Sequence, residues 1–220
     1  MATARPGPFQ RRYGAGARRP GGPLRRAIIP LALLAAGIIG CAAPPPLEVL
    51  GQAPDFTLTD QAGAPFRTSD LAGRVALVDF VYTHCTDACP TLSATMSAAQ
   101  NKLAAEKLLG SKAVLLSVTV DPAHDTPAAL AEYGKQFGAD AGTWKLLTGD
   151  WDQVYDVVAG FKVGTRAPRP AVGAPAPGGD EISHTTRVVL VDGERQIRAY
   201  LPGDVATPDD MVAAVKRVLR

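Results

Sequence analysis

"VALVDFVYTHCTDACP", residues 75–90, places an apolar run directly ahead of two cysteines that are four positions apart. The run is too short for most helices and rich in β-branched residues, so Val75 to Tyr82 is predicted to form a buried strand. Pro90 lacks an N–H and suits the first turn of a helix, so we expect a helix that begins at Pro90 with Cys89 as its N-cap. The chain is therefore expected to turn from strand to helix at the cysteines.

The residues that follow repeat this alternation of strand and helix. Apolar side chains recur at helical spacing from Pro90 to about Leu109. "AVLLSVTV", residues 113–120, predicts a second buried strand. A second helix is expected from Pro127, with Thr126 as its N-cap.

The other expected elements are a strand pair within 55–73, a short strand at 144–150, a helix from Trp151, a hairpin of 187–192 and 196–201 with its turn at Asp192-Gly193, and a closing helix at 208–220. Strands that alternate with helices favour a sheet with parallel members, and the late hairpin makes that sheet mixed. We therefore predict an α/β protein of thioredoxin-like fold, with a central mixed sheet flanked by helices. The Pro/Gly/Ala-rich segment 166–181 predicts a mobile loop.

Charge is distributed unevenly along the chain. Of the 220 residues, 46% are hydrophobic, enough for one well-buried core. Residues 1–40 hold seven of the 23 basic side chains and no acidic one, which leaves 16 basic and 21 acidic residues in the remainder. A mildly acidic body argues against binding to nucleic acid.

The N-terminal segment is typical of an export signal. An arginine-rich stretch ends at Arg26 and leads into 14 uncharged residues, 27–40, which are followed by Cys41. A run of this length fits the apolar core of a signal peptide better than a bilayer span. "IIGC", residues 38–41, resembles a bacterial lipobox, in which Cys41 would be lipidated; the alternative is an uncleaved anchor. Arg25-Arg26 resembles a twin-arginine signal more loosely.

These features divide the chain into three parts. We expect a lipoprotein-type export signal at 1–40, a Pro-rich tether at 41–52 and a thioredoxin-like domain at 53–220. With either kind of anchor the domain is expected to be extracytoplasmic and attached to the membrane, where thiols tend to oxidise.

Two cysteines at this spacing are compatible with three kinds of site. Helix N-termini favour anions, so we expect Cys85 and Cys89 to ionise more readily than ordinary thiols. A structural disulfide would close a very small loop and stabilise little. A redox couple is plausible on this fold, although redox pairs commonly have two intervening residues. A metal site needs further ligands.

The chain has three histidines that could supply such a ligand. His84 adjoins Cys85 and could tune its pKa or face solvent. His124 lies in a loop before a helix and is interpreted as a surface residue. His184 lies directly before the strand expected at 187–192. If that strand neighbours the one that ends at Tyr82, its first residues can meet the cysteine loop.

Three motifs occur in the order found in one known family. "VDFVYTHCTDACP" (78–90), "VTVDPAHDTP" (118–127) and "SHTTRVVLVD" (183–192) make residues 50–220 resemble the Sco/SenC family of thioredoxin-like copper-binding proteins. That family assists assembly of the dinuclear copper centre of cytochrome c oxidase. The resemblance implies that Cys85, Cys89 and His184 are copper ligands. The sequence departs from the common family pattern at Thr86 and Ser183, where proline and aspartate are frequent.

The resemblance implies an extracytoplasmic copper metallochaperone tethered to the membrane. Two thiolates suit Cu(I), an imidazole also allows Cu(II), and zinc would accept the same ligands. The expected partner is the copper-receiving subunit of cytochrome c oxidase or another copper chaperone. The alternative is a thiol–disulfide reductase that keeps the oxidase copper-site cysteines reduced; Cys85 and Cys89 would then cycle and His184 would be dispensable. A redox or copper sensor is the third hypothesis.

Overall fold

The structure is a computed structural model that describes residues 45–86, 88–166, 183–184 and 186–220, with the backbone alone at 165–166 and 183–184. The described residues belong to one compact unit, residues 43–220. Cys41, the expected export signal and most of the expected mobile loop lie outside the described residues. In the part that is described, no helix combines the length and apolarity that crossing a membrane would require.

The apolar run ahead of the cysteines forms the central strand, β4 (Val75–Val81), all of whose residues are buried. It pairs in parallel with β5 (Ala113–Thr119) and antiparallel with β9 (Arg187–Val191). A strand covered on both faces needs a nearly continuous hydrophobic sequence, which is why the run does not alternate with polar residues. The strand predicted at Val75 to Tyr82 is confirmed and ends one residue earlier.

The sheet has eight strands within the part of the chain that the structure describes, in the order β1-β10-β9-β4-β5-β6-β2-β3. The strands not yet introduced are β1 (Gly51–Gln52), β2 (Thr57–Asp60), β3 (Pro65–Arg67), β6 (Trp144–Thr148) and β10 (Gln196–Pro202). β4, β5 and β6 run parallel and all other pairs are antiparallel, so the predicted mixed sheet is confirmed. A separate pair, β7 (Thr165–Arg166) and β8 (Ser183–His184), and β1 were not foreseen from the sequence.

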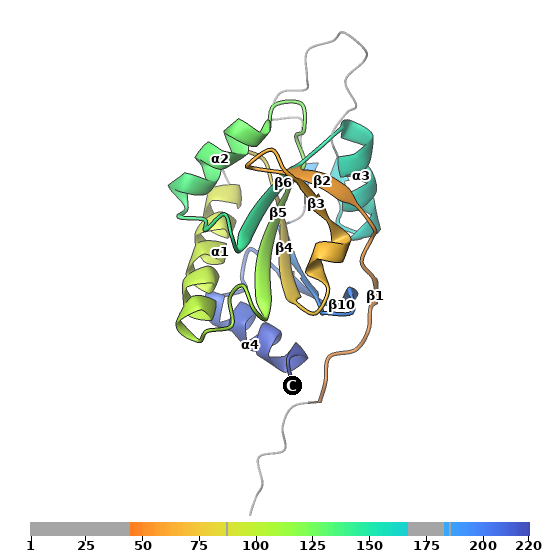
Figure 1. Cartoon of the computed structure of the whole chain (residues 1–220), viewed down its shortest axis with the longest axis vertical. Coiled ribbons are helices and arrows are strands. Elements are labelled where there is room, and N and C mark those ends of the chain that lie inside the picture. The colour runs from red at the N-terminus through yellow and green to blue at the C-terminus, as the bar shows by residue number, and fades with distance from the viewer. Residues whose placement is uncertain (1–44, 87, 167–182, 185) are drawn as a thin grey trace, which may run out of the picture. The chain divides into compact units, whose positions relative to one another are not determined.

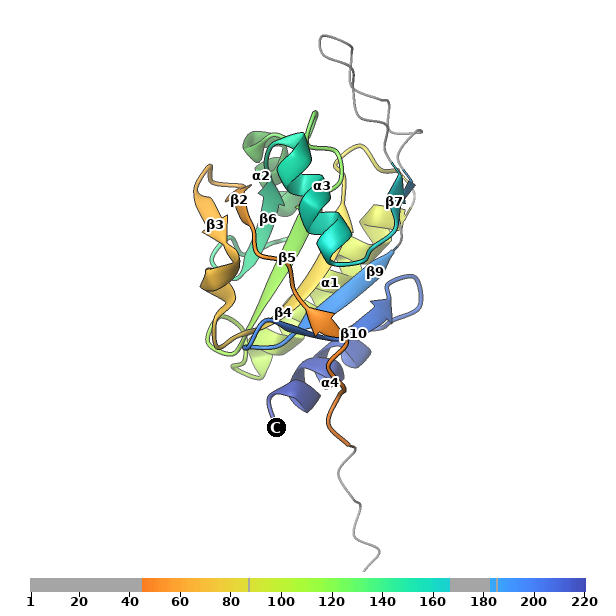
Figure 2. The ribbon, with the colours of Figure 1, turned by 90° about the vertical axis from the view of Figure 1, so that its right-hand side faces the viewer.

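In the described residues, four α-helices cover the sheet: α1 (Ala88–Ala105), α2 (Pro127–Gln136), α3 (Trp151–Gly160) and α4 (Pro208–Val218), with a short 3-10 helix, η1 (Thr68–Leu71). α1, α2 and α4 lie on one face and α3 lies on the other (Figures 1 and 2). The Thr126 hydroxyl accepts a hydrogen bond from the backbone N–H of Ala129 at 3.2 Å, which confirms the predicted cap of α2. α1 ends four residues before the expected Leu109, because Lys107 adopts a positive φ of 59°.

The hairpin of β9 and β10 determines which segment lies beside the cysteine loop. Its turn is closed by the Asp192 carboxylate, which accepts hydrogen bonds from the backbone N–H groups of Glu194 and Gln196. Val78 of β4 lies opposite Val189 in the antiparallel register. The first residues of β9 therefore lie at the end of β4 where the cysteine loop begins. This is the condition on which a role for His184 depended.

The segment before β1 lies against the opposite end of the domain. The backbone N–H of Leu50 donates to the carbonyl of Ile197 at 2.8 Å, and the Arg217 guanidinium donates to the carbonyl of Pro45 at 2.9 Å. Ile197 pairs with Val191, the last residue of β9. The described part of the expected tether thus meets the domain at the end of the sheet that is far from the cysteines.

The backbone of Gly203 packs closely against Thr186, the residue before β9, and a substitution at Gly203 tests whether the fold depends on this contact. The N–H of this glycine donates to the carbonyl of Thr186 at 2.5 Å, and a Cβ added to Gly203 would lie 2.2 Å from that carbonyl oxygen and 2.9 Å from Cδ1 of Leu92. We expect Gly203→Ala to lower the free energy of unfolding by about 1–3 kcal/mol, as overpacking does. Urea titration of the full chain in detergent measures this change.

Gly51→Ala is the matched control, because its added Cβ would meet only Nζ of Lys162, at 3.6 Å. We expect the control to stay within about 0.5 kcal/mol of the wild type. Equal losses for the two variants would contradict the proposed clash at Thr186.

Candidate metal centre

The two cysteines lie where β4 gives way to α1. The backbone N–H of Cys85 donates to the carbonyl of Tyr82 at 3.2 Å, and this turn directs the Cys85 sulfur at the start of the helix. The backbone N–H of Cys89 donates to Sγ of Cys85 at 3.3 Å. The predicted N-cap was therefore wrong: α1 begins at Ala88, and Cys89 lies inside its first turn. Cys85 supplies the acceptor that caps the helix, and Pro90 is tolerated because the first turn leaves its N–H position unbonded.

Both sulfurs belong to buried thiols that interact with each other. Cys85 is 8% exposed and Cys89 is fully buried. Burial raises the pKa of the Cys89 thiol far above its ordinary value, and a hydrogen bond with the Cys85 side chain raises it further. The expectation that Cys89 would ionise readily at the helix N-terminus was thus wrong, because desolvation outweighs the helix dipole. A metal that binds Cys89 must displace its proton.

The loop after β5 holds the cysteine loop in position. The Thr83 hydroxyl donates to Oδ1 of Asp125 at 2.6 Å, and the Thr83 backbone N–H donates to the same carboxylate. The Thr119 hydroxyl donates to the other oxygen of Asp125. The Asp125 side chain is fully buried, and both of its oxygens accept hydrogen bonds. Burial raises the pKa of Asp125, and the bonds from Thr119 and Thr83 oppose that rise. This contact across 42 residues was not foreseen from the sequence.

A second buried carboxyl lies in β4 itself, at Asp79. Ser117 donates to its Oδ1 at 2.5 Å, and Nε1 of Trp144 donates to the Ser117 hydroxyl at 2.9 Å. Oδ2 of Asp79 has no hydrogen-bond partner among the described residues. Burial raises the pKa of Asp79 to about 7, and its charge contributes to the raised pKa of Cys89. Sequence reasoning missed this residue, although a lone aspartate inside an apolar strand was the available signal.

The structure brings together two of the three predicted ligands. His184 belongs to β8, where its backbone pairs with that of Thr165, and its side chain lies outside the described part of the structure. Among the described side chains, no group of three from His, Cys, Asp and Glu is arranged to hold a metal ion. The pair of thiols alone fits one soft cation, because hydrogen-bonded sulfurs are close enough to share it.

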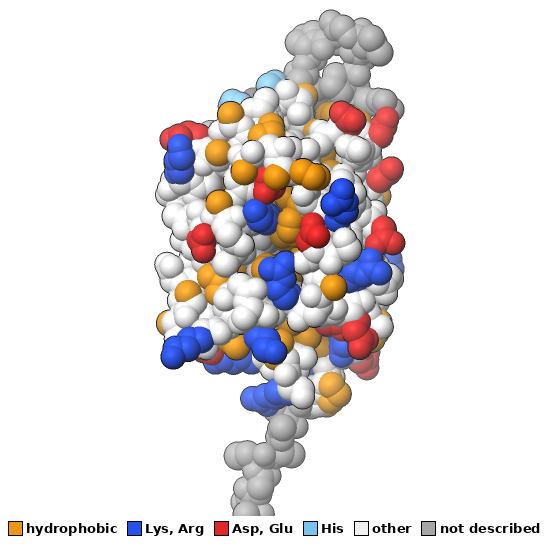
Figure 3. Space-filling model, in the orientation of Figure 1, with side chains coloured by type: hydrophobic (Ala, Val, Ile, Leu, Met, Phe, Trp, Pro, Cys, Tyr) orange, Lys and Arg blue, Asp and Glu red, His pale blue; other side chains and the backbone are white. Residues whose placement is uncertain are grey.

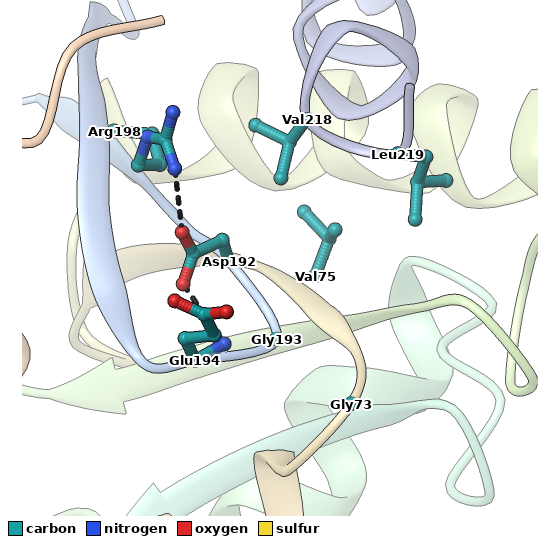
Figure 4. Close-up of a pocket in the computed structure, with 8 residues that line it drawn as sticks. All are labelled: Gly73, Val75, Asp192, Gly193, Glu194, Arg198, Val218 and Leu219. Carbon is teal, nitrogen blue, oxygen red and sulfur yellow. Dashed lines mark hydrogen bonds and ion pairs between the residues drawn. The ribbon is translucent and has the colours of Figure 1, made fainter.

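A groove of about 380 Å³ lies at the other end of β4 and is separate from this site (Figure 4). It is bounded by Val75, the hairpin turn and the last residues of α4. Asp192 and Arg198 form an ion pair of 2.8 Å on its wall, as the dashed line in Figure 4 shows. This groove contains no cysteine or histidine and contributes nothing to the candidate centre.

Comparison with known proteins identifies relatives by sequence. The model of the SCO1/SenC family matches residues 48–220. The SCO1 protein homolog of Bacillus subtilis is 29% identical over 164 residues, which cover 73% of this chain and 79% of the relative. Several other curated relatives are matched over about 50% of their own length.

Two solved structures extend the comparison. Bradyrhizobium japonicum ScoI with copper bound has a TM-score of 0.63 and 27% identity, and the match covers 76% of this chain and 99% of that one. BsSco, described with a disulfide switch and as a member of the Sco family of cytochrome c oxidase assembly proteins, has a TM-score of 0.65 and 26% identity, with 79% and 98% covered. The predicted thioredoxin-like fold, a mixed sheet with flanking helices, is confirmed by these neighbours.

Asp79 predicts an unusual dependence of stability on pH. Its pKa in the folded protein, about 7, lies above the ordinary value of 3.8, so the folded state retains a proton that the unfolded state has released between these values. Raising the pH from about 4 to about 7 should therefore lower the free energy of unfolding, by up to about 1.4 kcal/mol per pH unit.

Asp79→Asn removes this titration, so the difference between wild type and variant isolates the carboxyl. Urea unfolding across this pH range measures it. We expect the free energy of unfolding of the variant, minus that of the wild type, to increase as the pH rises. If the two free energies change in parallel with pH, the pKa of Asp79 is not raised by folding.

Proposed function

The chain belongs to the SCO1/SenC family, and on that premise we propose that it is an extracytoplasmic, membrane-tethered copper metallochaperone that binds its cargo through Cys85, Cys89 and His184. The observation that carries the proposal is the hydrogen-bonded pair of thiols at the start of α1. The antiparallel register of β4 and β9 supports it, since the residues before β9 run toward the same end of the sheet.

The donor set suits copper in either common oxidation state. Two thiolates favour Cu(I), and an imidazole allows Cu(II) to be retained. Zinc accepts the same ligands but usually takes a fourth. Because the pKa of Cys89 is strongly raised, binding at this sulfur releases a proton, and affinity should fall as the solution becomes more acidic.

The two sulfurs are not equivalent for transfer. Cys85 is slightly exposed, whereas Cys89 is fully buried. A receiving protein would therefore reach the cargo first at Cys85. His184 belongs to a different segment from the cysteines, so separation of the two segments offers a path for release. The proposed receiver is the copper-receiving subunit of cytochrome c oxidase or another copper chaperone.

A thiol–disulfide reductase is the second candidate, favoured by the pairing of the thiols and by the disulfide switch described for BsSco. In that role the Cys85 thiolate would attack a disulfide of the target, and Cys89 would displace the target thiol to leave an internal Cys85–Cys89 disulfide. The target is reduced and this chain is oxidised. The high pKa of Cys89 disfavours it as the thiol that makes the first attack, which is why that role is given to Cys85.

His184→Ala distinguishes the two candidates. An imidazole ligand contributes to copper affinity but is not needed for thiol exchange. We expect the variant, as the reduced full chain in detergent, to bind copper about 10–100-fold more weakly and to reduce disulfides at the wild-type rate. Competition titration with a copper chelator and a disulfide-reduction assay measure the two properties.

Cys85→Ser and Cys41→Ser form a matched pair of controls for the titration. The first should abolish tight binding and the second should not alter it. In cells that lack the native protein, a chaperone predicts that His184→Ala fails to restore oxidase activity at limiting copper, with partial rescue by added copper. Full restoration at limiting copper would instead support the reductase.

Attachment through Cys41 is a separate part of the proposal. If "IIGC" is a lipobox, the mature protein should begin at a diacylglyceryl-modified Cys41, and Cys41→Ser should block that processing. Mass spectrometry of the protein from membrane fractions tests this expectation. Recovery of a mature chain that retains residues 1–41 would establish an uncleaved anchor instead.

A further inference from the structure

Two histidines outside the proposed ligand set lie next to each other on the surface. The rings of His84 and His124 have centroids 5.7 Å apart and planes inclined at 71°. Both residues are exposed, and His84 directly precedes Cys85. Histidine side chains are grouped at the upper end of the molecule in Figure 3. The sequence interpretation treated each of them separately, because 39 residues lie between them.

The ring of His124 is fixed by a buried carboxylate. Its Nδ1 lies 2.8 Å from Oδ2 of Asp121, whose side chain is only 1% exposed. Oδ1 of Asp121 has no hydrogen-bond partner among the described residues. The carboxylate is therefore held through its other oxygen, which is bonded to His124. A carboxylate accepts hydrogen bonds, so Nδ1 carries the proton and the lone pair of the neutral ring lies on Nε2. A carboxylate behind the ring in this way orients metal-binding histidines in proteins.

His84 has the same tautomer for a related reason. Its Nδ1 lies 3.3 Å from the Thr83 hydroxyl oxygen, and that hydroxyl donates its own proton to Asp125 at 2.6 Å. The Thr83 oxygen can then only accept from His84, which leaves the lone pair of His84 on Nε2. Both imidazoles are thus prepared as metal ligands through the same ring nitrogen.

The separation of the rings suits a single ion. A metal bound by Nε2 at about 2.0–2.1 Å lies roughly 3 Å from the centre of the ring. Two ring centres 5.7 Å apart are therefore within the roughly 6 Å that two imidazoles bound to one ion can span, provided that both rings turn their Nε2 atoms toward it. Imidazole suits borderline divalent cations, above all Cu(II).

We propose that His84 and His124 form a second metal site, an exposed two-imidazole site that takes Cu(II) or a similar divalent cation from solvent. Water completes the coordination, so the ion exchanges easily. The site goes beyond the proposed Cys85, Cys89 and His184 centre, because it shares no ligand with it. Its position beside Cys85 would keep a loosely held ion next to the buried thiols.

The test uses the full chain with every ligand of the first centre removed. In Cys85→Ser/Cys89→Ser/His184→Ala, the remaining histidines of the sequence are His84 and His124. Titration with Cu(II) alone, followed by electron paramagnetic resonance, should show one bound ion with nitrogen hyperfine structure. Adding His84→Ala or His124→Ala should each weaken binding by at least about tenfold and remove part of that structure.

Two further variants make the outcome decisive. Lys135→Ala, an exposed change on α2, should leave Cu(II) binding unaltered, whereas Asp121→Asn should weaken it without changing the number of nitrogen ligands. If the serine background does not fold, Cys85→Ala/Cys89→Ala replaces it. Absence of Cu(II) binding in a folded background, or binding that survives loss of both histidines, would overturn the proposal. Because the first centre is removed in this assay, failure of the metallochaperone proposal would not affect its result.

Discussion

The pairing of β4 with a parallel strand on one side and an antiparallel strand on the other determines what meets the cysteines. β5 ends where β4 ends, while β9 begins there. Three segments that are distant in the sequence therefore converge: the cysteine loop, the loop at 120–126 and the residues before β9. The hydrogen bonds of Thr83 to Asp125 depend on this convergence. So does any approach of His184 to the thiols.

Burial gives that end of the sheet its chemical character. Cys89, Asp79 and Asp125 all have a raised pKa, and burial is the leading cause in each case. Where water is excluded, charges interact strongly over longer distances, and Asp79 accordingly opposes ionisation of Cys89. The interior near the thiols is poorly suited to two negative charges at once. A bound cation would reverse that preference, which favours ligands that become anionic only when the metal arrives.

Much of this architecture could be predicted because its signals are local. The apolar content of β4, the cap at Thr126 and the hairpin signal at Asp192-Gly193 each depend on a few adjacent residues. The errors at Cys89 have two causes. A local hydrogen bond to the Cys85 sulfur replaces the expected cap, and complete burial, which depends on the tertiary structure, raises the thiol pKa. The contact of Thr83 with Asp125 and the proximity of His84 to His124 depend on strand order, which spacing alone does not specify.

The contacts of Pro45 and Leu50 with the far end of the domain have a geometric consequence. β4 separates those contacts from the cysteine loop by seven residues, a length of about 23 Å at the rise of an extended strand. If Cys41 is the point of attachment, three residues separate it from Pro45, so the anchored segment joins the domain at the end of the sheet that is far from the thiols. Such an attachment would favour receiving proteins whose metal site lies on a domain that projects from the membrane. A metal site level with the lipid headgroups would be harder for the thiols to reach.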